Sequence, residues 1–66
     1  MRVRVNGEAR ELPDEVTLAA ALAELGLPAA RVAVELNREI VHREEFANLH
    51  LAEGDVLEIV RIVGGG

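Results

Sequence analysis

The apolar run from residue 56 to residue 63 limits what this chain can fold into more than any other segment. In an extended strand its apolar side chains would lie on both faces, with Val56, Val60 and Ile62 on one side and Leu57, Ile59 and Val63 on the other. Only Glu58 and Arg61 interrupt the run. A strand that is apolar on both sides is usually central in its sheet and covered twice. We therefore expect residues 56–63 to form the central strand of a sheet.

The N-terminal segment predicts a β-hairpin. Met1, Val3 and Val5 alternate with arginines, which is the period of a half-buried strand. Asn6-Gly7 follows and is the strongest short hairpin signal, because a type I′ turn needs positive φ at both central positions. We expect the return strand at about residues 9–12.

Two registers of this hairpin stay open. A two-residue turn would place Glu8 opposite Val5 and Arg10 opposite Val3, on the intended core face. A four-residue loop would instead pair Leu12 with Val3.

A short amphipathic helix is predicted over residues 18–25. Thr17 has the residue type of an N-cap, and Gly26 followed by Leu27 and Pro28 is typical of a helix end. Leu18, Leu22 and Leu25 form one apolar stripe at i, i+4 and i+7. Because so short a helix is not stable alone in water, this stripe must dock on a sheet.

The remaining segments complete a β-β-α-β-β-β order. We expect strands at residues 32–36, which alternate in polarity, and at the short segment 40–41, with a turn at 37–39 between them. Residues 42–46 are expected to form one helical turn anchored by Phe46, and residues 52–55 to form another turn. The right-handed crossover rule returns the strand after the helix beside the first hairpin. We therefore predict an α+β domain of β-grasp (ubiquitin-like) architecture over residues 1–63, with four to five strands in a mixed sheet packed on one helix. The first and last strands would be parallel in its middle.

One short helix covers only one face of such a sheet, so part of the last strand's apolar surface should be exposed for partner docking. The candidate contacts are Leu57 or Ile59 on one face, Val60 or Ile62 on the other, and Arg61. The sequence leaves open which face the helix covers.

Composition excludes several function classes. With 66 residues and no cysteine, the chain has neither a disulfide framework nor a cysteine metal site, and His42 and His50 are too few for structural zinc. Serine and cysteine are absent, so Ser-His or Cys-His catalysis is excluded, and we expect no catalytic residue and no metal. A net charge of −5 with one aromatic residue argues against nucleic acid. With no apolar run of membrane-spanning length, we expect a cytoplasmic protein, monomeric when free.

Gly64, Gly65 and Gly66 end the sequence and are predicted to form a flexible tail. The simplest interpretation is a frayed end. The functional interpretation is that glycine passes through channels too narrow for side chains. The last six residues, counted from Val60, would span about 20 Å when extended and could reach into another protein's active site. The terminal carboxylate is a weak electrophile, and without a phosphate-binding loop in this chain a separate enzyme would have to activate it.

Several segments together resemble the ubiquitin-like sulfur carriers, and most closely those of thiamine biosynthesis. They are residues 5–8 (VNGE), 14–18 (DEVTL), 34–37 (VELN), 40–46 (IVHREEF), 54–59 (GDVLEI) and the final Gly65-Gly66 pair. The resemblance covers the whole chain, and Gly64 occupies the variable position before the glycine pair.

The resemblance implies a function and a set of partners. A ThiF-like adenylyltransferase would use ATP and Mg²⁺ to adenylate the Gly66 carboxylate, and a persulfide donor would convert it to a thiocarboxylate. That group would donate sulfur to the thiazole synthase ThiG. Gly64 and Gly65 would thread the tail, and this chain itself would bind no cofactor.

Three alternatives stay open. The small subunit of molybdopterin synthase has the same fold and tail chemistry, a ubiquitin-like modifier would join its terminus to a target lysine, and a plain interaction module would not use the tail at all. The carboxylate pairs Asp14-Glu15 and Glu44-Glu45 are most simply solvated charges near helix starts, or else steer the protein onto a basic groove.

Overall fold

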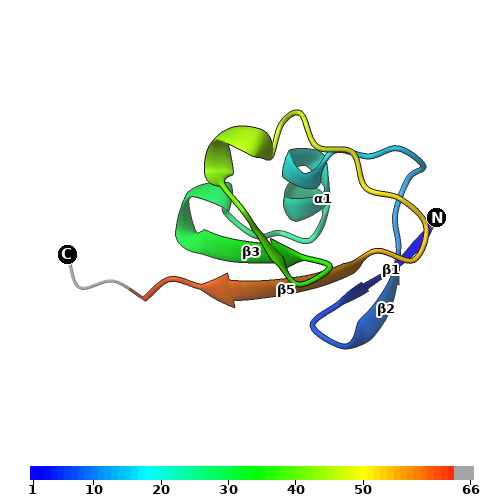
Figure 1. Ribbon diagram of the computed structural model, residues 1–66, viewed down its shortest axis with the longest axis horizontal. Coiled ribbons are helices and arrows are strands. Elements are labelled where there is room, and N and C mark those ends of the chain that lie inside the picture. The colour runs from blue at the N-terminus through cyan, green and yellow to red at the C-terminus, as the bar shows by residue number, and fades with distance from the viewer. Residues whose placement is uncertain (64–66) are drawn as a thin grey trace.

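The computed structural model describes residues 1–63, which form a five-stranded mixed sheet with one α-helix against one face (Figure 1). The strands are β1 (Arg2–Val5), β2 (Glu8–Glu11), β3 (Val32–Leu36), β4 (Glu39–Val41) and β5 (Val56–Arg61). The helices are α1 (Leu18–Glu24) and the 3-10 turns η1 (Ala29–Arg31) and η2 (Arg43–Glu45). The strand order is β2-β1-β5-β3-β4, with β1 and β5 parallel and the other pairs antiparallel. The predicted β-grasp fold is confirmed, with β1 and β5 parallel as expected. The strand after the helix, β3, lies beside β5 and not beside the first hairpin, because β5 is inserted between them.

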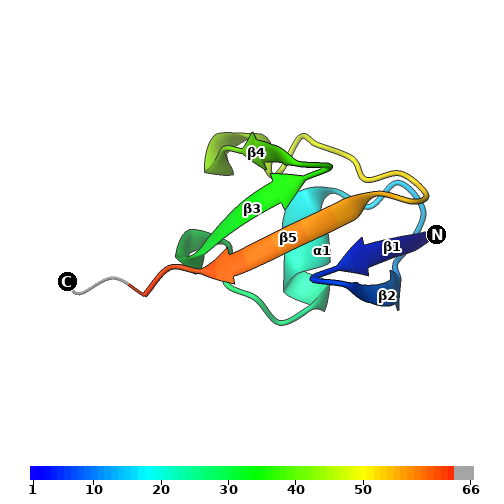
Figure 2. The same cartoon turned by 60° about the horizontal axis from the view of Figure 1, so that its bottom comes forward.

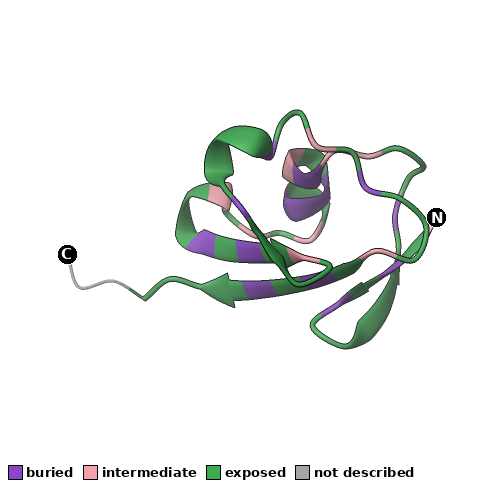
Figure 3. Cartoon of the chain, viewed as in Figure 1, coloured by how far each residue is buried: buried purple, intermediate pink, exposed green. Residues whose placement is uncertain are grey.

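The core lies between α1 and the inner face of the sheet. Leu57 of β5 is fully buried, and Ile59 is only 8% exposed. Leu18 and Leu22 of α1 are also buried and lie in the same cluster. The opposite face of the sheet carries no helix among residues 1–63, and Figure 2 shows it turned towards the viewer. Along β3 and most of β5, buried and exposed residues alternate, as the colouring in Figure 3 shows.

Local signals at both ends of α1 act as the sequence predicts. The Thr17 hydroxyl oxygen accepts a hydrogen bond from the Ala20 N–H at 3.1 Å, which satisfies one of the free donors of the first turn. At the other end Gly26 has φ +72, and the N–H of Leu27 donates to the Leu22 carbonyl at 2.9 Å. This geometry is a Schellman motif, in which glycine avoids the cost of a left-handed backbone.

The register of the first hairpin is the one set by a two-residue turn. Val5 lies opposite Glu8 and Val3 opposite Arg10, so β2 begins one residue earlier than expected. All four residues of β2 are exposed because it is an edge strand. The two charged side chains that point towards the helix side therefore remain in solvent, where Arg10 and Glu8 approach to 3.5 Å. Leu12 is buried just beyond the strand.

The N-terminal ammonium closes the open end of this hairpin. It donates hydrogen bonds to the Leu12 carbonyl at 2.7 Å and to the Asp14 carboxylate at 3.0 Å. The hydrogen bond to Asp14 raises the pKa of the Met1 ammonium above its usual value, against a smaller opposing effect of desolvation. The strand and the loop before α1 are thereby joined.

A second tight turn joins β3 to β4. Asn37 and Arg38 have φ values of 51° and 73°, the positive pair that a type I′ turn requires. Asparagine tolerates this region, whereas the Cβ of an arginine there costs about 1–2 kcal/mol. Arg38 therefore holds a strained backbone on an exposed hairpin.

Replacing Arg38 with glycine should raise the free energy of unfolding by about 0.5–1 kcal/mol, because relief of strain exceeds the added entropy of the unfolded chain. Urea denaturation of the full chain measures the change. Arg38→Ala is the matched control, since it removes the charge and keeps the Cβ. An equal gain in the alanine variant would show that charge, and not backbone strain, is responsible.

Candidate functional site

The chain leaves the folded body at the end of the central strand (Figure 1). β5 ends at Arg61, two residues before the predicted end, because β3 begins at Val32, which pairs with Arg61. One further hydrogen bond, from the Ile62 N–H to the Arg31 carbonyl at 2.8 Å, continues the attachment. Val63 is 95% exposed. The predicted tail, Gly64, Gly65 and Gly66, lies outside the described residues.

The structure divides the predicted partner contacts between the two faces of β5. Val60 and Ile62 are 63% and 51% exposed, and Arg61 is also exposed. Leu57 and Ile59 are buried beneath α1 and are thus removed from the candidate surface. Alternation alone could not distinguish the faces, because both carry apolar residues of similar size.

Ile40 belongs to the same exposed face, although the sequence reasoning did not include it. It is 71% exposed and lies opposite Glu35 of β3. Its neighbour Val41 is buried, so alternation along this short strand was the signal that could have placed Ile40 outside.

The side chain of Asn6 anchors β5 where β1 ends. Its Nδ2 donates to the Ile59 carbonyl at 3.0 Å, and its Oδ1 accepts from the Ile59 N–H at 2.7 Å. The Asn6 backbone N–H also donates to the Leu57 carbonyl at 2.9 Å. The Asn6 side-chain amide therefore makes the hydrogen bonds to β5 that the backbone of one more residue of β1 would make. The residue that it holds, Ile59, lies three positions before Ile62. Sequence reasoning assigned Asn6 only to the turn and missed this contact.

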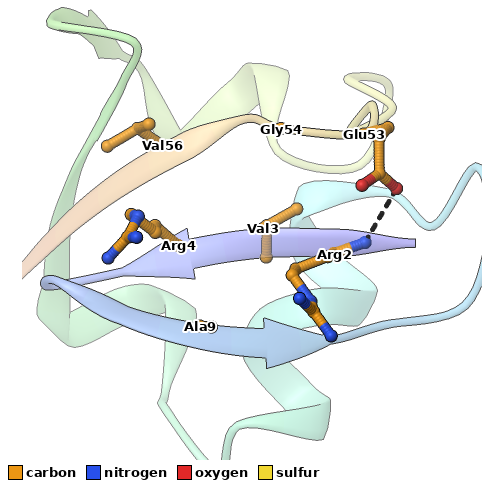
Figure 4. A pocket seen from close by; sticks show the side chains of 7 residues that line it. All are labelled: Arg2, Val3, Arg4, Ala9, Glu53, Gly54 and Val56. Carbon is orange, nitrogen blue, oxygen red and sulfur yellow. Dashed lines mark hydrogen bonds between the residues drawn. The ribbon is translucent and has the colours of Figure 1, made fainter.

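A shallow hollow of about 230 Å³ lies on the outer face beside β1 and the turn at residues 53–54 (Figure 4). The Arg2 N–H donates to the Glu53 carboxylate at 2.9 Å, as the dashed line shows. The Arg2 guanidinium contacts Glu11 at 3.4 Å, and that of Arg4 donates to the Gly7 carbonyl at 3.1 Å. These polar groups of the hollow are therefore already paired within the chain.

Neither histidine belongs to a group of side chains, among residues 1–63, that could bind a metal ion. His42 and His50 are both exposed, and the backbone of His50 forms an isolated bridge with Thr17. Over residues 1–63, three or more acidic or histidine side chains do not come together in a way that could hold a metal ion. The described helices are also too short to cross a membrane.

Comparison with known proteins gives consistent matches. The sequence profile of the ThiS family matches residues 3–66. A sulfur carrier protein ThiS of Thermus thermophilus is 41% identical over 64 residues, covering 97% of this chain and 98% of that one. A thiazole synthase of Paramagnetospirillum magneticum is 44% identical over all 66 residues, which span only 20% of its length. The crystal structure of a thiamine biosynthesis protein (ThiS) from Geobacter metallireducens superposes with a TM-score of 0.86 at 32% identity, covering both chains fully.

The Asn6 anchor predicts a local effect on β5. Asn6→Gly keeps the positive φ unstrained and removes both side-chain hydrogen bonds, so the free energy of unfolding should fall by roughly 1–3 kcal/mol. Amide hydrogen exchange should accelerate most at Ile59.

Asn37→Gly is the matched control, because the Asn37 Oδ1 accepts a hydrogen bond from the Val56 N–H at 2.9 Å, at the opposite end of β5. It should accelerate exchange at Val56 and not selectively at Ile59. Identical exchange profiles in the two variants would contradict the anchoring role of Asn6.

Proposed function

The chain belongs to the ThiS family, the sulfur carriers of thiamine biosynthesis, and from this premise we propose that it carries sulfur on the carboxylate of Gly66. The observation that carries the proposal is the profile match, which runs through the whole glycine segment to residue 66. The fold is compatible, because β5 directs the chain out of the body and Val63 is almost fully exposed.

The proposed chemistry has three steps at Gly66. Its carboxylate oxygen attacks the α-phosphorus of ATP, which releases pyrophosphate and forms an acyl-adenylate. The terminal sulfur of a persulfide then attacks the acyl carbon and displaces AMP, and a thiol reductant cleaves the resulting acyl disulfide to leave the thiocarboxylate. Activation is needed because a carboxylate is ionised at neutral pH and is a poor electrophile.

The protein is a carrier and not a catalyst, so its partners supply the reactive groups. We assign ATP and Mg²⁺ to a ThiF-like adenylyltransferase and the sulfur to a persulfide donor. The chain has no cysteine that could compete for the activated carbonyl. Because the reaction consumes ATP, we place it in the cytoplasm.

The sulfur acceptor that we propose is the thiazole synthase ThiG. Support comes from the thiazole synthase of Paramagnetospirillum magneticum, in which a segment similar to this entire chain makes up a fifth of the protein. That arrangement links a domain of this type to a synthase in one polypeptide. The family match favours this pathway over the molybdopterin and protein-modifier alternatives.

We propose that partners contact the exposed part of β5 next to the tail. Val60, Arg61 and Ile62 are exposed, and they lie two to four residues before Gly64, the first glycine of the tail. Any enzyme that receives Gly66 in its active site must come near these side chains. Burying their apolar surface would favour binding by about 25 cal/mol per Å².

Intact-protein mass spectrometry tests the carrier function directly. After incubation with the adenylyltransferase, ATP and a persulfide donor, the chain should gain the mass of one oxygen exchanged for sulfur. A chain truncated before Gly65 should fold normally and gain nothing, since the described strands end by Arg61 and the core cluster ends at Ile59. Absence of both adenylate and thiocarboxylate on the full chain would overturn the proposal.

The docking role of Val60 and Ile62 makes a separate prediction. A Val60→Thr, Ile62→Thr double variant should keep its stability within about 0.5 kcal/mol, because both sites are exposed. Its kcat/KM for thiocarboxylate formation should fall about tenfold, as expected when two apolar contacts with the enzyme are weakened. Val56→Thr, on the same face at the far end of β5, is the control. An equal loss in that control would contradict a docking site next to the tail.

A further inference from the structure

Two glutamates face each other on the outer side of the sheet. Glu35 of β3 pairs directly with Glu58 of β5, and both side chains are exposed on the face opposite α1. Directly opposed residues of antiparallel strands have their Cβ atoms about 5 Å apart, and like charges in such a pair are destabilising. The free protein therefore carries a local repulsion at the centre of this face.

The rest of the described chain does not neutralise this pair. Over residues 1–63, the hydrogen bonds and ion pairs of the carboxylates involve other residues than Glu35 and Glu58. Arg38 lines a hollow together with Glu58, yet the two do not form an ion pair. The acidic pair thus faces solvent and forms no ion pair with another described residue.

The surroundings of the pair are apolar. A small hollow of about 140 Å³ is lined by both glutamates together with Ala33, Ile40 and Val60. Ile40 lies opposite Glu35. The next pair on the same face is Ala33 with Val60, two residues further along β5 towards the C-terminus. Ile62 follows Val60 by two residues, is 51% exposed, and donates its N–H to the Arg31 carbonyl at 2.8 Å.

This arrangement constrains any partner that covers Val60. Such a partner also covers Glu58 and Glu35, and an apolar surface alone would bury two adjacent carboxylates and leave their desolvation uncompensated. A guanidinium can bridge both carboxylates, because its five N–H donors lie in a rigid planar fork. Its flat faces are also weakly hydrated and suit contact with Ile40 and Val60.

We infer that the thiazole synthase docks on this face by placing a basic side chain, an arginine by geometry, between Glu35 and Glu58. The inference rests on the proposed function, which supplies the synthase as the partner. The apolar residues on either side exclude water from the ion pair, and the paired charges fix the orientation of the carrier. The repulsion present in the free protein is relieved only in the complex.

The test compares the double variant Glu35→Gln, Glu58→Gln with the unaltered chain. Calorimetric titration into purified thiazole synthase should show affinity lower by about tenfold, with a weaker dependence on salt. The melting temperature of the free double variant should rise by about 2–5 °C, because the cross-strand repulsion is removed. Weaker binding by a more stable protein is a result that a purely structural role would not give.

The control variant is Glu24→Gln, Glu39→Gln, which changes the net charge by the same amount at exposed positions on α1 and β4. Its affinity for the synthase should stay within about twofold of the unaltered chain, as long-range effects are screened by salt. Equal losses in both variants would show a general charge effect and overturn the inference. Unchanged affinity in the Glu35, Glu58 variant, or no binding of the unaltered chain, would also overturn it.

This outcome can be separated from the carrier proposal. Binding is measured with the carboxylate form of the chain, whereas thiocarboxylate formation is followed by mass spectrometry with the adenylyltransferase. If thiocarboxylate forms normally and the glutamine variant binds as tightly as the control, the inference fails and the carrier function stands. The single variant Glu58→Gln should give a smaller loss of affinity in the same direction.

Discussion

The structure depends on β5, the central strand, whose inner face completes the core and whose outer face is exposed. β1 and β3 both pair with β5, and β2 and β4 join the sheet only through them. The inner residues Leu57 and Ile59 complete the core under α1, while Val60 faces outward. Because the same strand leads directly to the glycine tail, whatever stabilises β5 also fixes the point from which the tail leaves the body.

Much of the fold follows from local signals in the sequence. Asn6-Gly7 specifies a two-residue turn, Thr17 and Gly26 bound the helix, and each acts through contacts within a few residues of itself. The apolar run at residues 56–63 indicates a central strand, and β5 is central. Only its inner face is covered, however, and Val60 and Ile62 on the outer side stay exposed. These features can be predicted since their physical causes are short in range.

The remainder depends on contacts between residues distant in sequence. Whether Leu57 or Val60 is buried depends on the side to which α1 crosses. That Glu8 and Arg10 can lie on the helix side of the sheet depends on the place of β2 at its edge, where both stay exposed. The bonds between Asn6 and Ile59 join residues 53 positions apart. The opposition of Glu35 and Glu58 likewise requires the register of β3 against β5, which neither strand reveals alone.

The unfavourable features of this domain lie where a carrier can use them. Burial on the inner face supplies stability, and the outer face retains an uncompensated acidic pair and exposed Ile40 and Val60. A carrier must leave one enzyme to meet the next, so its affinity for each has to be limited. A small apolar surface contributes modest affinity, whereas a charge pair that must be matched penalises partners that lack the complementary cation. Specificity can thus be high on a face that binds each partner only transiently.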